Sequence, residues 1–148
     1  MKTLPVSFNE AIEQSIKKYW NRNALSDYGE ITFQYKDAAR IIAKLHILFE
    51  ETGIKKGDKI ALCGSNSSRW GMAFIATITY GAVAVPILPD FHPEQIHQIT
   101  NHSEARLLFA ADKIWKKINA EEMPNLIGII GTEDYQVLYA REAELQET

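Results

Sequence analysis

The 148-residue sequence has a single cysteine, Cys63, and no excess of basic residues. A single cysteine cannot form an internal disulfide, and it excludes a zinc site built from cysteines. Sixteen Lys and Arg residues against nineteen Asp and Glu residues give a net charge of −3, which argues against a dedicated nucleic-acid-binding surface. Because unpaired cysteines are typical of reducing compartments, we expect a cytoplasmic protein without a nucleic-acid partner.

The four histidines lack the spacing of a metal site. His92, His97 and His102 follow one another at intervals of five residues, which puts neighbours about 140° apart around a helix, so that they do not share a face. His46 is expected to pack within a helix. Cys63, at the end of an apolar segment, is interpreted as a core thiol rather than a nucleophile. The sequence therefore predicts no metal site and no catalytic residue in this chain.

Long apolar runs are also absent, with one exception. Between Gly71 and Pro89 the chain carries no charged residue, and this length is almost enough to cross a bilayer. Two threonines interrupt the run and two prolines close it. Its character also changes from the helix-like MAFIATITY to the short, β-branched AVAVPI. We therefore predict a buried helix followed by a buried strand, and no transmembrane segment.

The first third of the sequence predicts two amphipathic helices with a hairpin between them. Ser7 and Glu10 have the spacing of a capping box at the start of the first helix. Gly53, a typical residue just beyond a helix, follows the second. The expected elements are helices at Phe8–Trp20 and Asp37–Thr52 and a hairpin of Ala24–Tyr28 with Ile31–Tyr35.

From Lys59 onward, short apolar strands alternate with helices, and this alternation is typical of a parallel sheet covered on both faces. We predict an α/β fold with a parallel-rich sheet flanked by helices on both faces. Residues 1–148 are expected to form one unit without an internal linker, and the polar end REAELQET, from Arg141 on, is expected to be a frayed helix. The predicted strands are Lys59–Cys63, Val83–Ile87, Arg106–Ala110, Leu126–Ile130 and a short Gln136–Tyr139, and the predicted helices are Arg69–Tyr80, Glu94–His102 and Lys113–Ala120.

The loop GSNSS, residues 64–68, follows a predicted strand and precedes a predicted helix. In doubly wound sheets this is where phosphates and other ligands bind. The loop has neither the glycine spacing nor the lysine of the known phosphate-binding motifs, so a polar turn in which Ser67 or Ser68 caps the helix is the favoured alternative. Trp70 lies close enough to the loop to stack on a ligand. The candidates for cofactor binding are Gly64, Ser65 and Asn66.

Four segments, in order along the chain, resemble the AMP-forming synthetase superfamily, which includes acyl-CoA synthetases, peptide-synthetase adenylation domains and luciferase. ITFQYKDAARIIAKL (Ile31–Leu45) resembles an early strand-and-helix segment of that family. TGIKKGDKIALCGSNSSRW (Thr52–Trp70) is similar to the stretch that follows, and ITYGAVAVPILPDFHPEQI (Ile78–Ile96) to the next. HSEARLLFAAD (His102–Asp112) is similar to a later strand. The sequences GAVAVP and HSEA are most similar to those of the long-chain fatty-acid branch of the family.

The resemblance implies a two-step reaction that uses ATP, Mg²⁺ and coenzyme A. A fatty-acid carboxylate attacks the α-phosphate of ATP to give an acyl-adenylate and pyrophosphate. The thiol of coenzyme A then displaces AMP to form a thioester. The family's Ser/Thr/Gly-rich ATP loop, its adenine segment, its ribose-binding aspartate and its catalytic lysine have no counterpart here. No catalytic residue of the family can therefore be assigned, and no cofactor is expected to bind this chain alone.

The leading hypothesis is that the chain is the N-terminal subdomain of a long-chain acyl-CoA synthetase, inactive alone, serving as scaffold and part of the cleft wall. Its partners would be the rest of its own polypeptide and, in the full-length enzyme, a long-chain fatty acid and coenzyme A; the full-length enzyme could lie peripherally at a membrane. The alternatives are a natural truncated, non-catalytic paralogue that binds lipid or another protein, and a free-standing nucleotide binder. The reading frame after Thr148 discriminates the first two.

A subdomain separated from the rest of an enzyme exposes the apolar surface that the rest would cover. We therefore expect self-association of the chain, with an unpaired sheet edge as one candidate surface. The sequence alone does not identify the residues that would form the contact.

Overall fold

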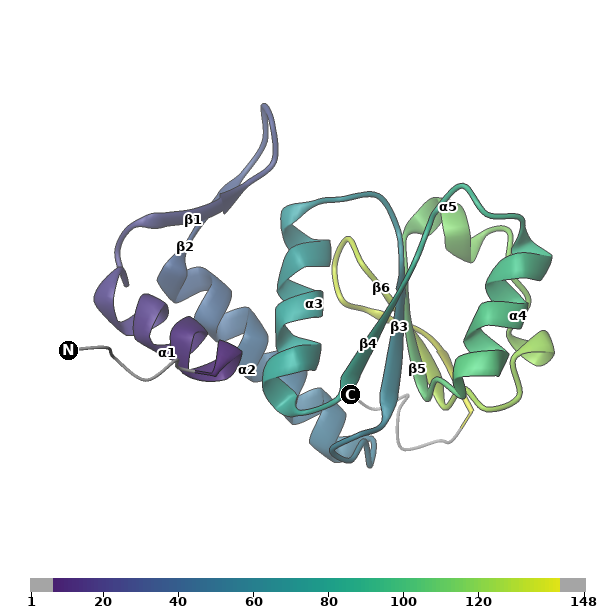
Figure 1. Ribbon diagram of the computed structural model, residues 1–148. Helices are drawn as coiled ribbons and strands as arrows, with labels where there is room; N and C mark the ends of the chain where they lie inside the picture. The colour runs from purple at the N-terminus through teal and green to yellow at the C-terminus, as the bar shows by residue number, and fades with distance from the viewer. Residues whose placement is uncertain (1–6, 142–148) are drawn as a thin grey trace.

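A five-stranded sheet forms the centre of the protein in the computed structural model, which describes residues 7–141 (Figure 1). Its strand order is β4-β3-β5-β6-β7. The first four strands in this order are parallel, and β7 runs antiparallel to β6. The strands are β3 (Lys59–Cys63), β4 (Val83–Ile87), β5 (Leu107–Ala110), β6 (Gly128–Gly131) and β7 (Val137–Ala140). The parallel-rich α/β sheet expected from the sequence is confirmed.

Helices cover both faces of this sheet, because the side chains of its central strands are buried on both sides (Figure 1). Ile60 and Leu62 of β3 face a core shared with α2 and α3, whereas Ala61 and Cys63 face a second core shared with α4 and α5. This alternation follows from the two-residue period of a strand. The helices are α2 (Tyr35–Glu51), α3 (Ser68–Tyr80), α4 (Pro93–Ser103) and α5 (Asp112–Trp115).

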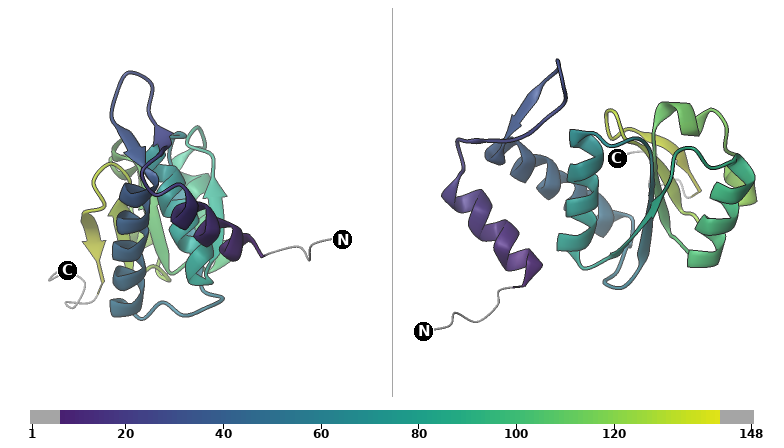
Figure 2. Two further views of the ribbon diagram at one scale, coloured as in Figure 1. Left: turned by 90° about the vertical axis from the view of Figure 1, so that its left-hand side faces the viewer. Right: turned by 45° about the horizontal axis from the view of Figure 1, so that its top comes forward.

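The N-terminal segment forms a layer of its own against α2 and α3 (Figure 2). Helix α1 (Phe8–Lys18) begins with the predicted capping box, in which Ser7 Oγ accepts from the Glu10 amide at 3.1 Å. The hairpin of β1 (Asn23–Ser26) and β2 (Thr32–Gln34) is a separate two-stranded sheet. Its tip projects away from the body of the molecule (Figure 1).

The uncharged run from Gly71 to Pro89 forms most of α3 and the strand β4, as predicted. The expected burial of the strand is wrong, because β4 is an edge strand in which only Ile87 is buried and Val83 is 46% exposed. No helix among residues 7–141 is long and apolar enough to cross a membrane. Glycine ends two of the helices, since Gly53 and Gly81 both have positive φ angles, of 81° and 98°. At Gly81 a Cβ atom would lie 3.0 Å from the Lys56 side chain, so the turn before β4 also needs the small residue.

The predicted helix Lys113–Ala120 is wrong in extent. Only Asp112–Trp115 is α-helical, and a short 3₁₀ turn follows at Ala120–Glu122. The α-helix ends at Trp115, and Asn119 caps the separate 3₁₀ turn, because its side chain accepts from the Glu121 amide at 3.0 Å. Asparagine offers the backbone this alternative bond and so favours starting a turn over continuing a helix. The expected frayed helix at the chain end lies, from residue 142 on, outside the described residues.

Other boundaries differ by at most two residues. Helix α1 ends at Lys18, two residues before the predicted end. Helix α2 begins at Tyr35, within the predicted second hairpin strand, because the Gln34 amide donates to Asp37 Oδ2 at 2.9 Å and this contact starts the helix early. Strands β5 and β6 begin one and two residues later than predicted.

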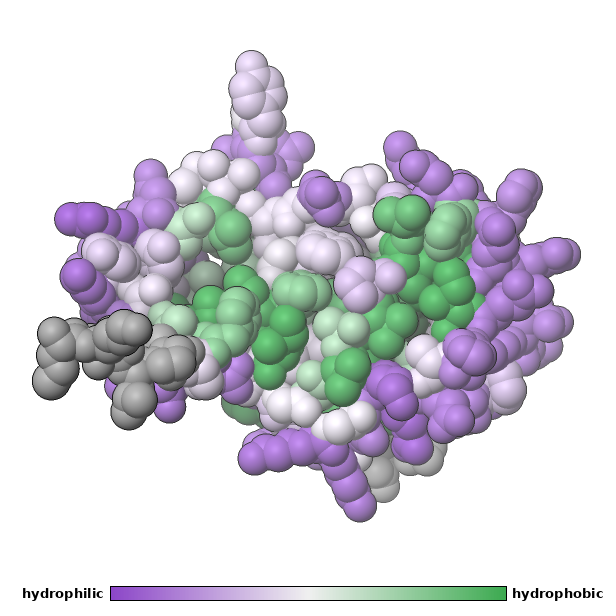
Figure 3. Space-filling view, in the orientation of Figure 1, coloured by the Kyte–Doolittle hydropathy of each residue, from purple (hydrophilic) through white to green (hydrophobic). Residues whose placement is uncertain are grey.

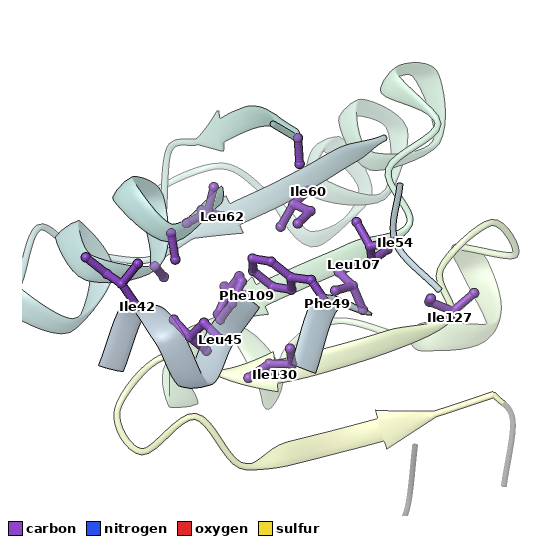
Figure 4. Packing of buried hydrophobic residues seen from close by; sticks show 13 residues of the cluster. Ile42, Leu45, Phe49, Ile54, Ile60, Leu62, Leu107, Phe109, Ile127 and Ile130 are labelled. Atoms are coloured by element: carbon purple, nitrogen blue, oxygen red, sulfur yellow. The ribbon is translucent and has the colours of Figure 1, made fainter. Parts of the chain in front are cut away.

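Phe49 of α2 lies at the centre of the larger core, between the helices and the sheet (Figure 4). Its side chain is fully buried. Its ring meets those of Tyr80 and Phe109 edge-on, with centroids 5.3 Å and 6.2 Å away. This geometry is favourable for aromatic pairs. Phe49 therefore joins α2, α3 and β5 in one contact.

We expect Phe49→Ala to lower the free energy of unfolding by about 3–5 kcal/mol, because it leaves a cavity and removes two aromatic contacts. Urea denaturation followed by circular dichroism measures this difference. Phe8→Ala is the matched control, since Phe8 is 52% exposed on α1, and we expect it to cost less than about 1 kcal/mol. Equal losses in the two variants would contradict the central role of Phe49.

Candidate ligand site at the carboxyl edge of the sheet

The loops that follow β3, β5 and β6 meet at one edge of the sheet and border an open hollow of about 370 Å³. This is the edge where ligands bind in doubly wound folds. The hairpin tip after β1 closes one side of the hollow, and the turn after β6 closes another. Segments that are far apart in the sequence therefore contribute to a single site.

Two of the three candidate residues line this hollow, and the third, Gly64, lies buried behind it. Ser65 and Asn66 are exposed and line it. Gly64 is buried, and a Cβ atom at this position would lie 3.2 Å from the Cβ atom of Ala111. The glycine therefore lets the loop after β3 pack closely on the loop after β5. Cofactor binding by Gly64, Ser65 and Asn66 stays a prediction.

The N-terminus of α3 is capped from two directions. Ser67 Oγ accepts from the Trp70 amide at 3.1 Å, so the helix-capping interpretation of this loop is confirmed. Asp27, from the hairpin tip, accepts from the Ser68 amide at 2.7 Å. A carboxylate is favourable at the positive end of a helix dipole. The place where a phosphate would bind at this helix start is thus taken by the chain's own aspartate.

A second carboxylate lies at the start of α5. Both oxygens of Glu133, in the turn after β6, lie within hydrogen-bond distance of the Asp112 amide, at 3.1 and 3.2 Å. Glu133 belongs to a turn that Tyr135 holds in place, because the Tyr135 hydroxyl donates to the Arg69 carbonyl at 2.7 Å. Burial raises the pKa of the Tyr135 hydroxyl, which keeps this donor protonated.

The side chains that line the hollow carry more negative than positive charge. Four carboxylates face two cations there, and no group of three or more metal-ligating side chains gathers among residues 7–141. This balance repels phosphates and favours cationic groups. The carboxylates are those of Asp27, Glu30, Asp112 and Glu133, and the cations are Arg69 and Lys113.

The other side chains that the sequence singled out lie in packed surroundings. Trp70 stacks on Phe74, with ring centroids 5.4 Å apart and planes 12° apart, and so fills the core on the α3 side instead of facing the hollow. His46 Nε2 lies 3.0 Å from the Ala76 carbonyl oxygen and 2.9 Å from Thr79 Oγ1. Cys63 is fully buried. The packing roles expected for His46 and Cys63 are confirmed.

Sequence reasoning missed Asp27, Glu133 and Tyr135. Asp27 and Ser68 are separated by 41 residues, and Glu133 and Asp112 by 21. No local pattern reports a contact over such distances. Tyr135 adopts a positive φ of 58°. This conformation is uncommon for residues other than glycine, and a tyrosine in a polar turn does not predict it.

The model of the AMP-binding enzyme family matches residues 12–147. Among relatives, YdaB of Bacillus subtilis, whose name assigns it to the acyl–CoA ligases, is 29% identical over 118 residues, which cover 80% of this chain and 23% of that protein. The long-chain-fatty-acid–CoA ligase of Escherichia coli O6:H1 is 28% identical over 99 residues, covering 67% of this chain and 18% of the ligase.

Solved structures show the same fold in larger proteins. The anthranilate CoA ligase AuaEII, in complex with anthranoyl-AMP, superposes with a TM-score of 0.80 at 20% identity over 89% of this chain and 26% of that one. Coronafacic acid ligase from Pectobacterium brasiliense superposes with a TM-score of 0.82 at 16% identity, over 97% of this chain and 30% of the ligase.

The fold is that of the N-terminal subdomain of adenylate-forming enzymes. The chain belongs to the AMP-binding enzyme family, because the family model covers nearly all of it. It spans about a quarter of the length of these relatives and solved structures, from 18% to 30%.

We expect Asp27→Ala to lower the free energy of unfolding by about 1–2 kcal/mol, because it removes the carboxylate cap of α3. Glu30→Ala is the matched control on the same hairpin, since Glu30 is exposed at the tip, and we expect it to change stability by less than about 0.5 kcal/mol. Urea denaturation of both variants measures the difference. Indistinguishable midpoints would show that the Asp27 contact contributes nothing.

Burial raises the pKa of the Cys63 thiol from 9.0 to about 11. At pH 8 the folded protein therefore holds about a hundredfold less thiolate than the unfolded chain, because each pH unit changes this fraction tenfold. We expect iodoacetamide to alkylate the folded protein at least about a hundredfold more slowly than the urea-unfolded chain at pH 8. The reaction rate should then rise with pH towards 11. Equal alkylation rates in the folded and the unfolded chain would contradict the buried position of Cys63 in the core.

Proposed function

We propose that this chain is the N-terminal part of an AMP-forming long-chain fatty-acid–CoA ligase. The full-length enzyme would convert a fatty acid, ATP and coenzyme A to acyl-CoA, AMP and pyrophosphate. The observation that supports it best is the family match over residues 12–147, together with relatives that are acyl–CoA ligases by name. The long-chain specificity is the finer part of the proposal. It is supported by the names of the Escherichia coli ligase and of the long chain acyl-CoA synthetase 3 of Arabidopsis thaliana, 31% identical over 78 residues.

In the proposed reaction, a carboxylate oxygen of the fatty acid attacks the α-phosphorus of ATP, and the bond to the pyrophosphate leaving group breaks. The sulfur of coenzyme A then attacks the acyl carbon, and AMP leaves with the electrons of the broken acyl–phosphate bond. Magnesium would offset the charge of the phosphates. The described residues do not fit that ion, because residues 7–141 contain no group of three or more His, Cys, Asp or Glu side chains that could hold a metal ion. We therefore assign the steps on ATP to residues outside this chain.

The part that we assign to this chain is a scaffold. Its two cores hold the loops after β3, β5 and β6 in fixed positions, and the carboxylates of Asp27 and Glu133 lock the starts of α3 and α5. Such an edge can form part of the wall of a larger cleft without contacting the reacting atoms. The acidic hollow is consistent with this role, because it disfavours phosphate binding by the chain alone.

We expect the purified chain to show no ATP–pyrophosphate exchange with a long-chain fatty acid, because the groups that would stabilise the departing pyrophosphate are not among its residues. Incorporation of labelled pyrophosphate into ATP measures this. The long-chain-fatty-acid–CoA ligase of Escherichia coli, assayed in parallel, is the positive control. Exchange by the isolated chain above the background without enzyme would overturn the scaffold role.

The same preparation tests the free-standing nucleotide binder. Titration with ATP, followed by the NMR signals of the Ser65 and Asn66 amides, should leave those signals unchanged at millimolar nucleotide. Saturable shifts of these two amide signals would instead support a nucleotide site in the loop at residues 64–68. They would contradict the proposal that the chain acts only as a scaffold.

A further inference from the structure

We propose that the outer face of helix α2 is the contact surface of a symmetric dimer with a second copy of this chain. This inference does not depend on the proposed enzymatic function. It concerns a groove of about 410 Å³ that runs between α2 and the segment leading into β7. The groove lies on the side of the sheet that α2 covers, and it shares no lining residue with the hollow at the carboxyl edge.

The groove is apolar at its centre. Ile41 and Leu48 of α2 form one wall, and Tyr135 and Val137, together with the charged Asp134, form the other. Ile47 also lines the groove and is 54% exposed. An exposed isoleucine at an apolar groove costs free energy in water, and burying both together recovers it. The groove therefore favours an apolar side chain of a partner over water.

The charges on α2 are arranged to fit a second copy of the same helix. Lys44 and Glu51 line the groove, three residues before and four residues after Ile47. Among the described residues neither one forms an ion pair. If two copies of α2 pack antiparallel and cross between Ile47 and Leu48, Lys44 of each copy lies opposite Glu51 of the other. Symmetric dimers require such a self-complementary pattern.

A single two-fold rotation thus gives both the apolar and the charged groups of this surface a partner on the second copy. It brings Ile47 of each copy to the groove of the other, and it forms two equivalent Lys44–Glu51 pairs at the flanks. A single helix pair of this kind predicts a weak, reversible dimer, because exposed ion pairs contribute little and the apolar contact is small.

Both edge strands of the sheet are less suited than α2 to contact with a second copy of the chain. On β4 the Val83 amide donates towards β3, to the Asp58 carbonyl, at 2.8 Å. The alternation of a strand then turns the backbone of Pro86 outward, where a proline has no N–H to donate. On β7 the register shifts at Leu138, which has no opposite residue on β6. Prolines and bulges at edge strands are features that oppose pairing with another strand.

The exposed apolar side chains near β4 are the main competing surface. Apolar residues gather over β4 and the helices beside it on the face shown in Figure 3. Val83 and Leu88 are 46% and 62% exposed. The α2 surface combines an exposed apolar side chain with Lys44 and Glu51 at self-complementary positions, so it is the one that we assign to self-association.

Charge reversal tests the proposal without removing any core residue. We expect the wild-type chain to show a concentration-dependent monomer–dimer equilibrium in sedimentation equilibrium. Lys44→Glu and Glu51→Lys should each weaken it by about tenfold or more, because each variant replaces two attractive pairs by two repulsive ones. Glu50→Lys, on the same helix but outside the groove, is the matched control and should dimerise as the wild type does.

Mixing the two charge variants gives the decisive result. Each is expected to be a folded monomer by itself, but an equimolar mixture should form a heterodimer, because position 44 of either variant then meets a side chain of opposite charge at position 51 of the other. Three results would overturn the proposal. They are a wild-type monomer at every concentration, a dimer unaffected by either variant, and a mixture no more associated than its components. A dimer that is unaffected by the α2 variants would point to the face near β4.

Discussion

The burial of the central strands on both faces is the constraint on which the rest of the structure depends. Every residue of β5 and all but the first residue of β3 are buried. Because successive side chains point to opposite faces, each of these strands needs an apolar layer on either side. Helices α2 and α3 supply one layer around Phe49, and α4 supplies the other around Ile96. The order of strands and helices along the chain follows from this need, since each crossover carries one helix to a face.

The same constraint determines where polar groups gather. Parallel strands bring their carboxyl ends to a single edge, so the starts of α3 and α5 also meet there. Two positive helix ends at one edge attract negative charge. In this chain the charge comes from Asp27, in the N-terminal hairpin, and from Glu133, in the turn between β6 and β7. The edge therefore resembles a phosphate site in its architecture while its own carboxylates fill the places of the phosphate. A family fold can keep this architecture even where the chemistry is carried by other parts of a larger enzyme.

Much of the fold could be predicted from the sequence, and particular residues show why. Strands β3 and β4 have the predicted bounds because each is a short apolar run that turn residues bound clearly. Helix α5 ends at Trp115, earlier than its periodicity predicts, and Asn119 caps a separate 3₁₀ turn that helical periodicity does not report. The site could be predicted only in part. The place of the loop at residues 64–68 after a strand identifies it as a candidate, but the packing of Gly64 on Ala111 and the long-range contacts of Asp27 depend on tertiary structure.

The surfaces that remain exposed indicate how such a unit joins a larger assembly. Pro86 on β4 and the register shift at Leu138 on β7 both oppose the addition of a further strand. Growth of the structure by strand pairing is therefore disfavoured at both edges. The helical layer is different, because α2 packs on the sheet, on α3 and on the N-terminal segment but still carries the exposed Ile47. A helix with an apolar outer position flanked by opposite charges can pack against a second helix with little rearrangement. Contacts between this unit and other polypeptide, whether a second copy or a further part of an enzyme, are thus expected through its helices before its sheet.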